Sequence, residues 1–313
     1  MLKVNSFDNY VGQENIKKTI NMMIKSSQIQ NKVLDHILIS GLAGTGKTTL
    51  AKIIAKIQNK NTHFAQGSLL DKKSDIVTLF SNIQAGDVIF IDEIHSINKN
   101  VEELLYTIME EFKIDVMIGT GTNAKIIRVK VKPFTLIGAT TKIYNISNPL
   151  KERFGFIAKM QPYTIEDIKK IILMHAHELK VEIEEDVVQF IAQFSRLNPR
   201  IIINLFNRII DFSIVEQQKM IDINLAKRAL KIMGIYKYGF SDEHIEYLKC
   251  FKLSSNSRFM SLYFISGITN YNKEDILGEI EPILLSYNLI IKSSRGRKIT
   301  PLGEKYLFEC NNY

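Results

Sequence analysis

The feature that most constrains this chain is a glycine-rich octapeptide, GLAGTGKT at residues 41–48, which fits the pattern G-x-x-x-x-G-K-[ST]. An apolar run precedes it at residues 36–40, and a helical stretch, TLAKIIAKIQ, follows it. Glycines in such a loop let backbone N–H groups turn toward a phosphate at the N-terminus of a helix. The flanking strand and helix favour a phosphate-binding loop over an ordinary glycine-rich turn. The sequence therefore predicts an α/β domain that binds a nucleoside triphosphate.

The loop and a nearby strand end offer side chains for ATP and Mg²⁺. We expect Lys47 to reach the β and γ oxygens and the Thr48 hydroxyl to ligate Mg²⁺. Asp92 and Glu93 stand where the apolar run DVIFID ends, an edge at which open α/β sheets bind ligands. Asp92 is expected to hold Mg²⁺ through water, and Glu93 to orient the attacking water. Two roles remain possible for His95, that of a packed residue and that of a catalytic one.

Three apolar runs, at residues 36–40, 87–92 and 134–141, are typical of strands covered on both faces. Helical patterns separate them, which predicts a parallel sheet with helices on both faces over residues 1–158. Residues 114–131 read instead as two alternating stretches around a glycine-rich turn, which predicts a projecting hairpin.

Alternation along this hairpin divides its apolar side chains between two faces. One set is expected to point inward, and it comprises Ile114, Val116, Ile118, Ile127, Val129 and Val131. Met117 and Ile126 would then lie on the opposite face, where exposed apolar side chains suggest a protein contact. Burial against the same domain is the alternative.

Beyond about residue 158 the patterns become helical. Thr164 and Asp167 resemble a capping box, Pro199 a helix start, and a further helix runs from near Asp222 to Gly234. We expect a small helical domain at 159–238. Residues 239–313 then show three helical stretches and a short hairpin, the layout of a winged helix.

The net charge of +8 is unevenly distributed along the chain. Residues 1–158 carry 20 Lys and Arg against 14 Asp and Glu, whereas residues 240–313 carry 9 against 9. Within this neutral last segment four cations lie close together, namely Lys292, Arg295, Arg297 and Lys298. A tight turn at Gly296 is expected to present both guanidiniums to DNA phosphates, against the alternative of a solvated basic loop.

Other features exclude several classes of protein. No apolar run approaches the ~18 residues needed to cross a bilayer and no signal-peptide pattern is visible, so we expect a cytoplasmic protein without a membrane partner. Cys250 and Cys310 have no metal-ligand spacing and are expected to be reduced thiols. His175 and His177 are two residues apart on a helix and do not share a face, which argues against a metal site.

A set of phrases in order makes the interpretation more specific. FDNYVGQENIKKTI, LDHILISG, GDVIFIDEIHSIN, MEEFKIDVMIG, KPFTLIGATT and NPLKERFG resemble the RuvB family of Holliday junction branch-migration ATPases, over about residues 3–306. The resemblance implies an AAA+ P-loop core, a helical lid and a C-terminal winged helix. It also implies ATP-driven branch migration in DNA recombination and repair, with a place in the SOS response.

The resemblance also assigns roles to individual residues. Thr141 resembles sensor 1, with Thr140 as the alternative, Arg153 resembles an arginine finger given to a neighbouring subunit, and Arg200 resembles sensor 2. The expected nucleotide-binding set, beyond Lys47, Arg153 and Arg200, comprises Leu2, Lys3, Tyr10, Val11, Gly41, Gly44, Gly46, Thr48, Thr49, Glu110, Glu111, Phe112 and Tyr163.

The implied partners are duplex DNA, Holliday junctions, a RuvA-like junction-binding protein at Met117 and Ile126, a junction-cleaving resolvase, and further copies in a ring, expected to be a hexamer. The sequence departs from the family in places. Leu42 and Ala43 replace two prolines of the loop, Lys292 stands where arginine is common, and LSSNSRF replaces a glycine-rich phrase. Phosphate contacts on the winged helix are expected to come from Lys292, Arg295 and Arg297.

Two other functions remain as alternatives. One is a different AAA+ protein, such as a clamp-loader subunit or a protein remodeller. The other is a winged-helix DNA-binding regulator in which ATP hydrolysis serves only as a switch. Strand separation of a four-way junction with ATP would discriminate among the three.

Overall fold

The three apolar runs form the middle of a five-stranded parallel sheet in this computed structural model, which describes residues 4–118, 125–253 and 259–310. They are β1 (Ile37–Ser40), β3 (Val88–Asp92) and β6 (Thr135–Thr140). The sheet order is β2-β3-β6-β1-β7, and every pairing is parallel. The predicted parallel sheet is confirmed.

The sequence analysis did not predict the two edge strands of this sheet. They are β2 (Thr62–Gln66) and β7 (Phe156–Lys159). β6 is buried along its whole length, whereas β2 has no buried residue and β7 has one. An edge strand lacks the continuous apolar run of a central one, because only one neighbour and part of each face cover it.

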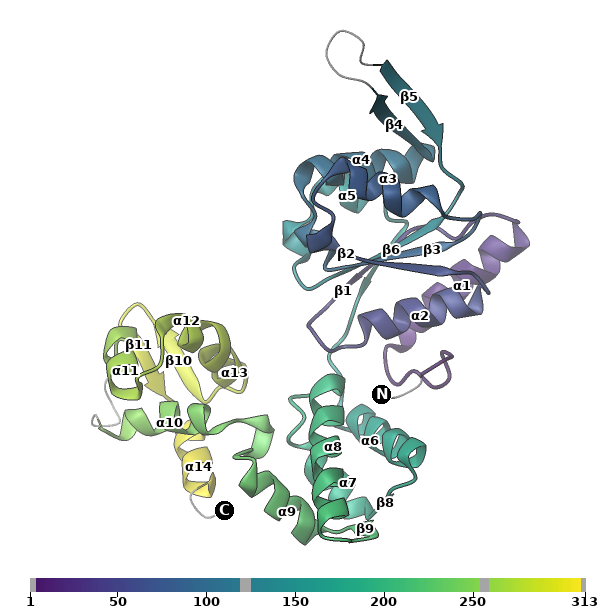
Figure 1. Ribbon diagram of the computed structural model, residues 1–313. Coiled ribbons are helices and arrows are strands. Elements are labelled where there is room, and N and C mark those ends of the chain that lie inside the picture. Colours follow the sequence, from purple (N-terminus) through teal and green to yellow (C-terminus); the bar gives the residue numbers. More distant parts are fainter. Residues whose placement is uncertain (1–3, 119–124, 254–258, 311–313) are drawn as a thin grey trace. The chain divides into compact units, whose positions relative to one another are not determined.

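Helices cover both faces of this sheet (Figure 1). On one face, α1 (Glu14–Ile29) and α2 (Lys47–Ile57) bury aliphatic side chains such as Ile20 and Leu50. The other face packs against α3 (Lys73–Ser81), α4 (Lys99–Glu111) and α5 (Asn148–Glu152). Two apolar cores result, one on each side of the strands.

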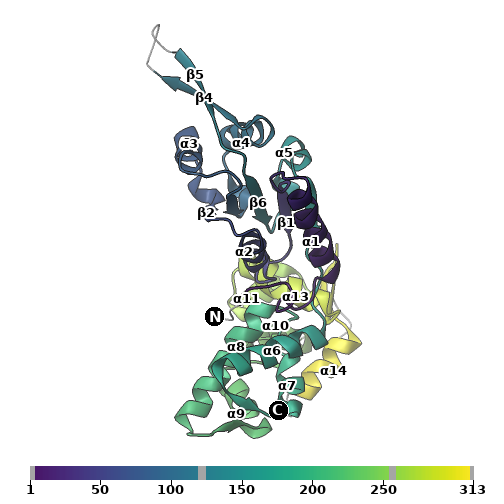
Figure 2. The ribbon, with the colours of Figure 1, turned by 90° about the vertical axis from the view of Figure 1, so that its right-hand side faces the viewer.

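The predicted hairpin exists as β4 (Lys113–Ile118) and β5 (Lys125–Lys130), and it projects beyond the helices (Figures 1 and 2). Met117 lies opposite Ile126 in the antiparallel register. Ile114 and Val131 are buried at its base.

One expectation for this hairpin is wrong. Ile127 and Val129 are each 47% exposed instead of pointing into the core. The ribbon extends past the edge of the domain, so the inward face beyond its base has no core to enter. Ile126 is 68% exposed, which leaves apolar side chains uncovered on both faces.

Contacts divide the chain into two units. One unit comprises Met1–Glu178 and Leu197–Ile201, and the other comprises Leu179–Arg196 and Ile202–Tyr313.

The remaining helices begin largely where their capping residues predict. In the first unit, Thr164 and Asp167 exchange hydrogen bonds ahead of α6 (Ile165–Leu179), as expected.

The helices that follow are α7 (Glu185–Ala192), α8 (Pro199–Val215) and α9 (Ile223–Ile232). The Asp222 carboxylate caps α9 by accepting the Leu225 N–H, as its position predicts. A short parallel pair, β8 (Glu182–Ile183) and β9 (Met220–Ile221), was not predicted.

The last segment has the expected winged-helix layout. Its helices are α10 (Asp242–Cys250), α11 (Leu262–Thr269), α12 (Lys273–Asp275), the π-helical turn η7 (Ile276–Ile280) and α13 (Glu281–Ser286). The hairpin β10 (Ile290–Ser293) and β11 (Gly296–Ile299) follows, and then α14 (Pro301–Cys310), which was not predicted. No helix among the described residues is long and apolar enough to span a membrane.

Candidate nucleotide site and DNA interface

The glycine-rich loop joins β1 to α2 and takes backbone angles that suit glycine. Gly44 and Gly46 have φ of 80° and 95°, and Gly46 directly precedes the first turn of α2. A Cβ on Gly44 would stand 2.4 Å from Asn198 Oδ1, which leaves no room for a side chain. Gly41, Thr48 and Thr49 lie partly exposed in the same loop and first turn. This is the cradle that the motif predicts.

Lys47 folds back across the loop that it belongs to. Its Nζ donates to the carbonyl oxygens of Gly41 and Leu42, each at 2.9 Å. Burial lowers the pKa of Lys47, while the charges of Glu93 and Asp92 act in the opposite direction. Arg200 is also near enough for its charge to lower this pKa. The loop lysine, the two acids and Arg200 therefore share one electrostatic environment.

The ends of β3 and β6 bring polar groups together beside the loop. The Thr141 hydroxyl donates to Glu93 Oε2 at 3.0 Å. Glu93 has φ 48° and ψ 47°, the left-handed region that a non-glycine residue enters at a cost of about 1–3 kcal/mol. Asp92 is partly exposed, and its Oδ1 accepts the Glu93 N–H. Thr141 thus lies beside Glu93, and its role as sensor 1 stays a prediction.

Two buried tyrosines support the loop from its protein side. Tyr163 donates its hydroxyl to the Thr45 carbonyl oxygen at 3.0 Å, and Tyr10 donates to the Gly46 carbonyl oxygen at 3.3 Å. Burial raises the pKa of both phenols, so they remain donors. Val11 is partly buried next to Tyr10. The predicted residues Leu2 and Lys3 lie outside the described residues.

Asn198 is a site residue that the sequence analysis used only as a helix start. Its Nδ2 donates to the Ala43 carbonyl oxygen at 2.8 Å, and its Oδ1 accepts the Arg200 N–H at 3.0 Å. One amide therefore contacts the phosphate loop and caps α8. Its position immediately before a proline at a helix N-terminus is the signal that could have identified it.

Arg153 belongs to a separate group. Its Nη2 lies 2.8 Å from Glu110 Oε2, near the end of α4, while Nε is buried without a partner among the described atoms. Glu111 is exposed beside Glu110, and Phe112 packs edge-on against Phe134. The ion pair holds the guanidinium next to Glu110, a member of the expected nucleotide-binding set, instead of against the phosphate loop of its own chain.

The hairpin β10–β11, residues 290–299, is the wing of the winged helix. The expectation that both guanidiniums of this wing face DNA is wrong for Arg297. Arg295 is exposed, whereas Arg297 is 9% exposed and its Nε donates to Glu281 Oε1 at 2.6 Å. Lys292 is exposed but also contacts Glu281, at 3.2 Å. Lys292 and Arg297 are cross-strand neighbours, so both reach the buried Glu281 carboxylate.

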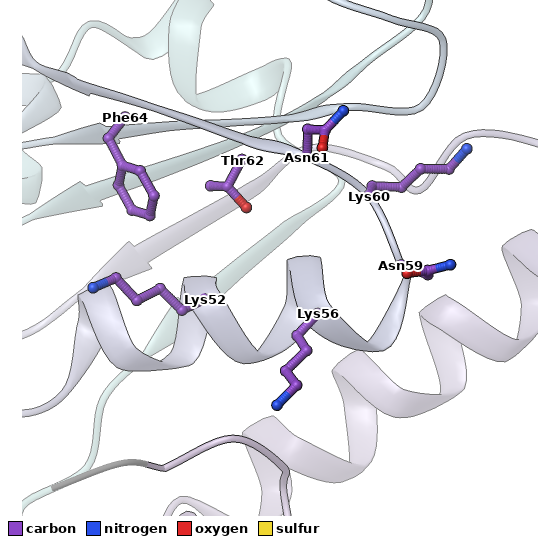
Figure 3. A pocket seen from close by; sticks show the side chains of 7 residues that line it. All are labelled: Lys52, Lys56, Asn59, Lys60, Asn61, Thr62 and Phe64. Carbon is purple, nitrogen blue, oxygen red and sulfur yellow. The ribbon is translucent and has the colours of Figure 1, made fainter.

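A basic hollow of about 390 Å³ lies elsewhere on the first unit (Figure 3). It is formed by the later turns of α2, the loop after it and β2, and its lining residues are Lys52, Lys56, Asn59, Lys60, Asn61, Thr62 and Phe64. None of its three lysines forms an ion pair with a described residue. No phosphate-loop residue lines it, so it is distinct from the nucleotide site.

Models of three RuvB domains match the chain in order. The Holliday junction DNA helicase RuvB P-loop domain covers residues 2–160, the RuvB AAA lid domain 163–236, and the RuvB C-terminal winged helix domain 237–308.

Individual proteins agree with these matches. The Holliday junction branch migration complex subunit RuvB of Mycoplasmopsis pulmonis is 47% identical over 306 residues, covering 98% of this chain and 97% of the relative. The subunit from Fervidobacterium nodosum is 41% identical, over 95% and 86%. The structure of the Thermotoga maritima RuvB Holliday junction branch migration motor superposes with a TM-score of 0.80 at 33% identity, over 98% of both chains. This chain belongs to the RuvB family of AAA+ ATPases.

Proposed function

We propose that this chain is the ATP-driven motor subunit of a Holliday junction branch-migration complex. The observation that carries the proposal is the joining, in one chain, of a phosphate-binding loop with two acids beside it and a winged-helix domain. Similarity over nearly the full length to subunits named for this activity supports it. Family membership also argues against the clamp-loader and regulator alternatives. We propose that the protein acts on DNA in the cytoplasm. We also propose that its three domains meet at about residues 158 and 238.

The residues of the site fit ATP and Mg²⁺. Gly44 has no room for a Cβ and leaves the loop backbone free to face a phosphate. The Thr48 hydroxyl and the Asp92 carboxylate offer the oxygen ligands that Mg²⁺ prefers. When bound, Mg²⁺ neutralises charge that develops on the phosphates. Lys47 is expected to leave the carbonyls of its own loop and bind the β and γ oxygens.

Turnover then depends on groups around the phosphates. Glu93 orients the attacking water. Thr141 donates a hydrogen bond to Glu93 in this structure and contacts the γ-phosphate when ATP is bound. Arg200 acts from its own chain as sensor 2. Arg153 acts on the site of a neighbouring copy, which requires a ring of heterologous contacts; we propose a hexamer.

Partners follow from two surfaces. The exposed Ile126, with Met117 opposite it in register, makes the hairpin β4–β5 a contact for a RuvA-like junction-binding protein. Arg295 and Lys292 of the wing contact DNA phosphates without regard to sequence, whereas Arg297 is buried and is withdrawn from that set. A junction-cleaving resolvase completes the proposed complex.

The test is strand separation of a four-way DNA junction, with ATP, by the chain together with a RuvA protein. We expect separation that Lys47→Ala abolishes. Ile126→Asp should lose the stimulation by RuvA and keep its basal ATPase, because the substitution lies on an exposed ribbon. ATP hydrolysis without any junction separation would contradict the proposed function, and normal stimulation of Ile126→Asp would contradict the hairpin contact alone.

A further inference from the structure

Beside Glu93 lies a histidine that the scheme above does not use. His95 is in the short 3-10 turn η2 (Ile94–Ser96) after β3, and 12% of its side chain is exposed. Its Nδ1 lies 3.0 Å from Glu93 Oε2 and 3.0 Å from Thr140 Oγ1. One ring nitrogen thus faces both the carboxylate and the end of β6, the strand that leads to Thr141.

A threonine anchors this nitrogen. His95 Nδ1 forms a hydrogen bond with Thr140 Oγ1 at 3.0 Å, and Glu93 Oε2 lies at the same distance from Nδ1 in polar contact. Thr140 Oγ1 already accepts the Lys142 N–H at 2.9 Å, which fixes the threonine that packs against the ring.

Two polar groups therefore contact one oxygen of Glu93. Thr141 donates its hydroxyl to Oε2, and His95 Nδ1 lies at the same distance from Oε2. No hydrogen bond to Oε1 comes from the part of the chain that the structure describes. Oε1 is thus the oxygen left to accept a hydrogen bond from water.

We propose that His95 is the positioning residue for Glu93: its ring, anchored on Thr140, lies against Oε2 and so turns Oε1 toward the attacking water. The proposal rests on the role proposed above for Glu93. The left-handed backbone of Glu93 needs surrounding contacts to persist, and the contact with His95 supplies one. When Thr141 turns to the γ-phosphate, His95 is the polar neighbour that remains on Oε2.

The test compares His95→Ala, His95→Asn and His95→Gln in the full chain, with kcat and KM measured for ATP in the presence of duplex DNA. Asparagine places an amide N–H close to the position of Nδ1, whereas glutamine places it close to Nε2. We expect alanine to lower kcat by about 10- to 100-fold, as misplacement of a catalytic group does, with little change in ATP affinity. Asparagine should restore most of the rate and glutamine should not.

His63→Ala is the matched control, because His63 also pairs with a carboxylate. Its Nε2 lies 2.9 Å from Oδ2 of Asp87, which directly precedes β3 at the end of the strand away from Glu93. Its kcat should equal that of the unmodified chain. Equal rates for the asparagine and glutamine variants, or a loss of ATP affinity as large as the loss of kcat, would overturn the proposal. Full turnover by Glu93→Gln would instead remove the role of Glu93, whereas an inactive Glu93→Gln beside a fully active His95→Ala would remove only that of His95.

Discussion

Two glutamates in this chain carry the same chemical group in opposite settings. The Glu93 side chain is 35% exposed at a strand end, and one of its oxygens accepts a hydrogen bond, from Thr141. Glu281, at the start of α13, is 1% exposed, and both of its oxygens accept hydrogen bonds. Tyr247 and Arg297 donate to Oε1, and Lys292 donates to Oε2.

The difference lies in the number of acceptor positions left open. A carboxylate with a free oxygen and access to solvent can take a proton from water or align it. A carboxylate whose oxygens are both occupied in a buried place can only hold its partners, and losing a partner leaves an uncompensated charge. Glu93 is thus arranged for chemistry, and Glu281 for the fold of the wing.

The largest effect is expected from Glu93→Gln. The amide cannot align water as the carboxylate does, so ATP turnover should fall by about 100-fold or more. Nucleotide binding should survive, whereas Lys47→Ala should weaken it by removing a phosphate contact. Steady-state hydrolysis and equilibrium binding of a fluorescent ATP analogue measure the two properties. Equal loss of affinity in both variants would contradict the separate roles.

Arg297→Ala should mainly affect stability. It leaves Glu281 buried beside a single cation, and breaking a buried ion pair in this way costs about 3 kcal/mol of unfolding free energy. Arg295→Ala is the control, since an exposed arginine should change this free energy by less than about 0.5 kcal/mol. Urea unfolding of the full chain, monitored by hydrogen exchange in β10 and β11, gives the change in unfolding free energy for both variants. Similar values for the two variants would mean that Arg297 does not hold the wing.

Acid should destabilise the wing through Glu281. Burial by itself raises its pKa, but hydrogen bonds, first of all from Arg297, outweigh burial and hold the pKa below the ordinary value of 4.5. A lowered folded-state pKa contributes stability that is complete above the ordinary value and is lost as pH falls through the folded value. Urea unfolding at pH 6 and at about pH 3 should therefore differ less for Glu281→Gln than for the unmodified chain. An identical pH dependence would argue against a charged Glu281.

The smallest effect is expected on DNA binding. Arg295→Ala should weaken duplex binding about equally across sequences and lower the slope of log affinity against log salt by about 1, because one phosphate contact is lost. Arg297→Ala should leave this slope unchanged under conditions in which the wing stays folded. Filter binding over a series of salt concentrations checks both. A slope that depends on Arg297 and not on Arg295 would reverse the assignment.

Much of this arrangement could be predicted from local sequence. The phosphate loop, the three central strands and the caps at Thr164 and Asp222 are determined by neighbouring residues, and all are confirmed. The edge strands β2 and β7 were missed because they have little of the continuous apolar pattern of buried strands. Local sequence does not show which strand ends meet, so Thr141 was assigned to the site only through the resemblance to a family, and its contact with Glu93 was not predicted.

The error at Arg297 has a different cause. Glu281 lies 16 residues upstream in a helix, where a glutamate usually marks a solvent-facing position. Only the folded winged helix brings it under the hairpin. The local pattern of four cations was interpreted correctly as charge, and its interpretation as exposed surface is wrong at Arg297. Asn198 shows the same limit, because its contact with Ala43 joins positions far apart in the chain.

The projecting hairpin has a consequence for how such a subunit is made in a cell. It is a two-stranded ribbon with Ile126 on one face and Ile127 and Val129 on the other, and no further strand among the described residues pairs with its sides. Newly synthesised chains that wait for a partner would present these ribbons to one another, and exposed strand edges of this kind promote aggregation. Balanced synthesis of motor and partner would therefore protect the motor, and an excess of the motor alone should shorten its soluble lifetime.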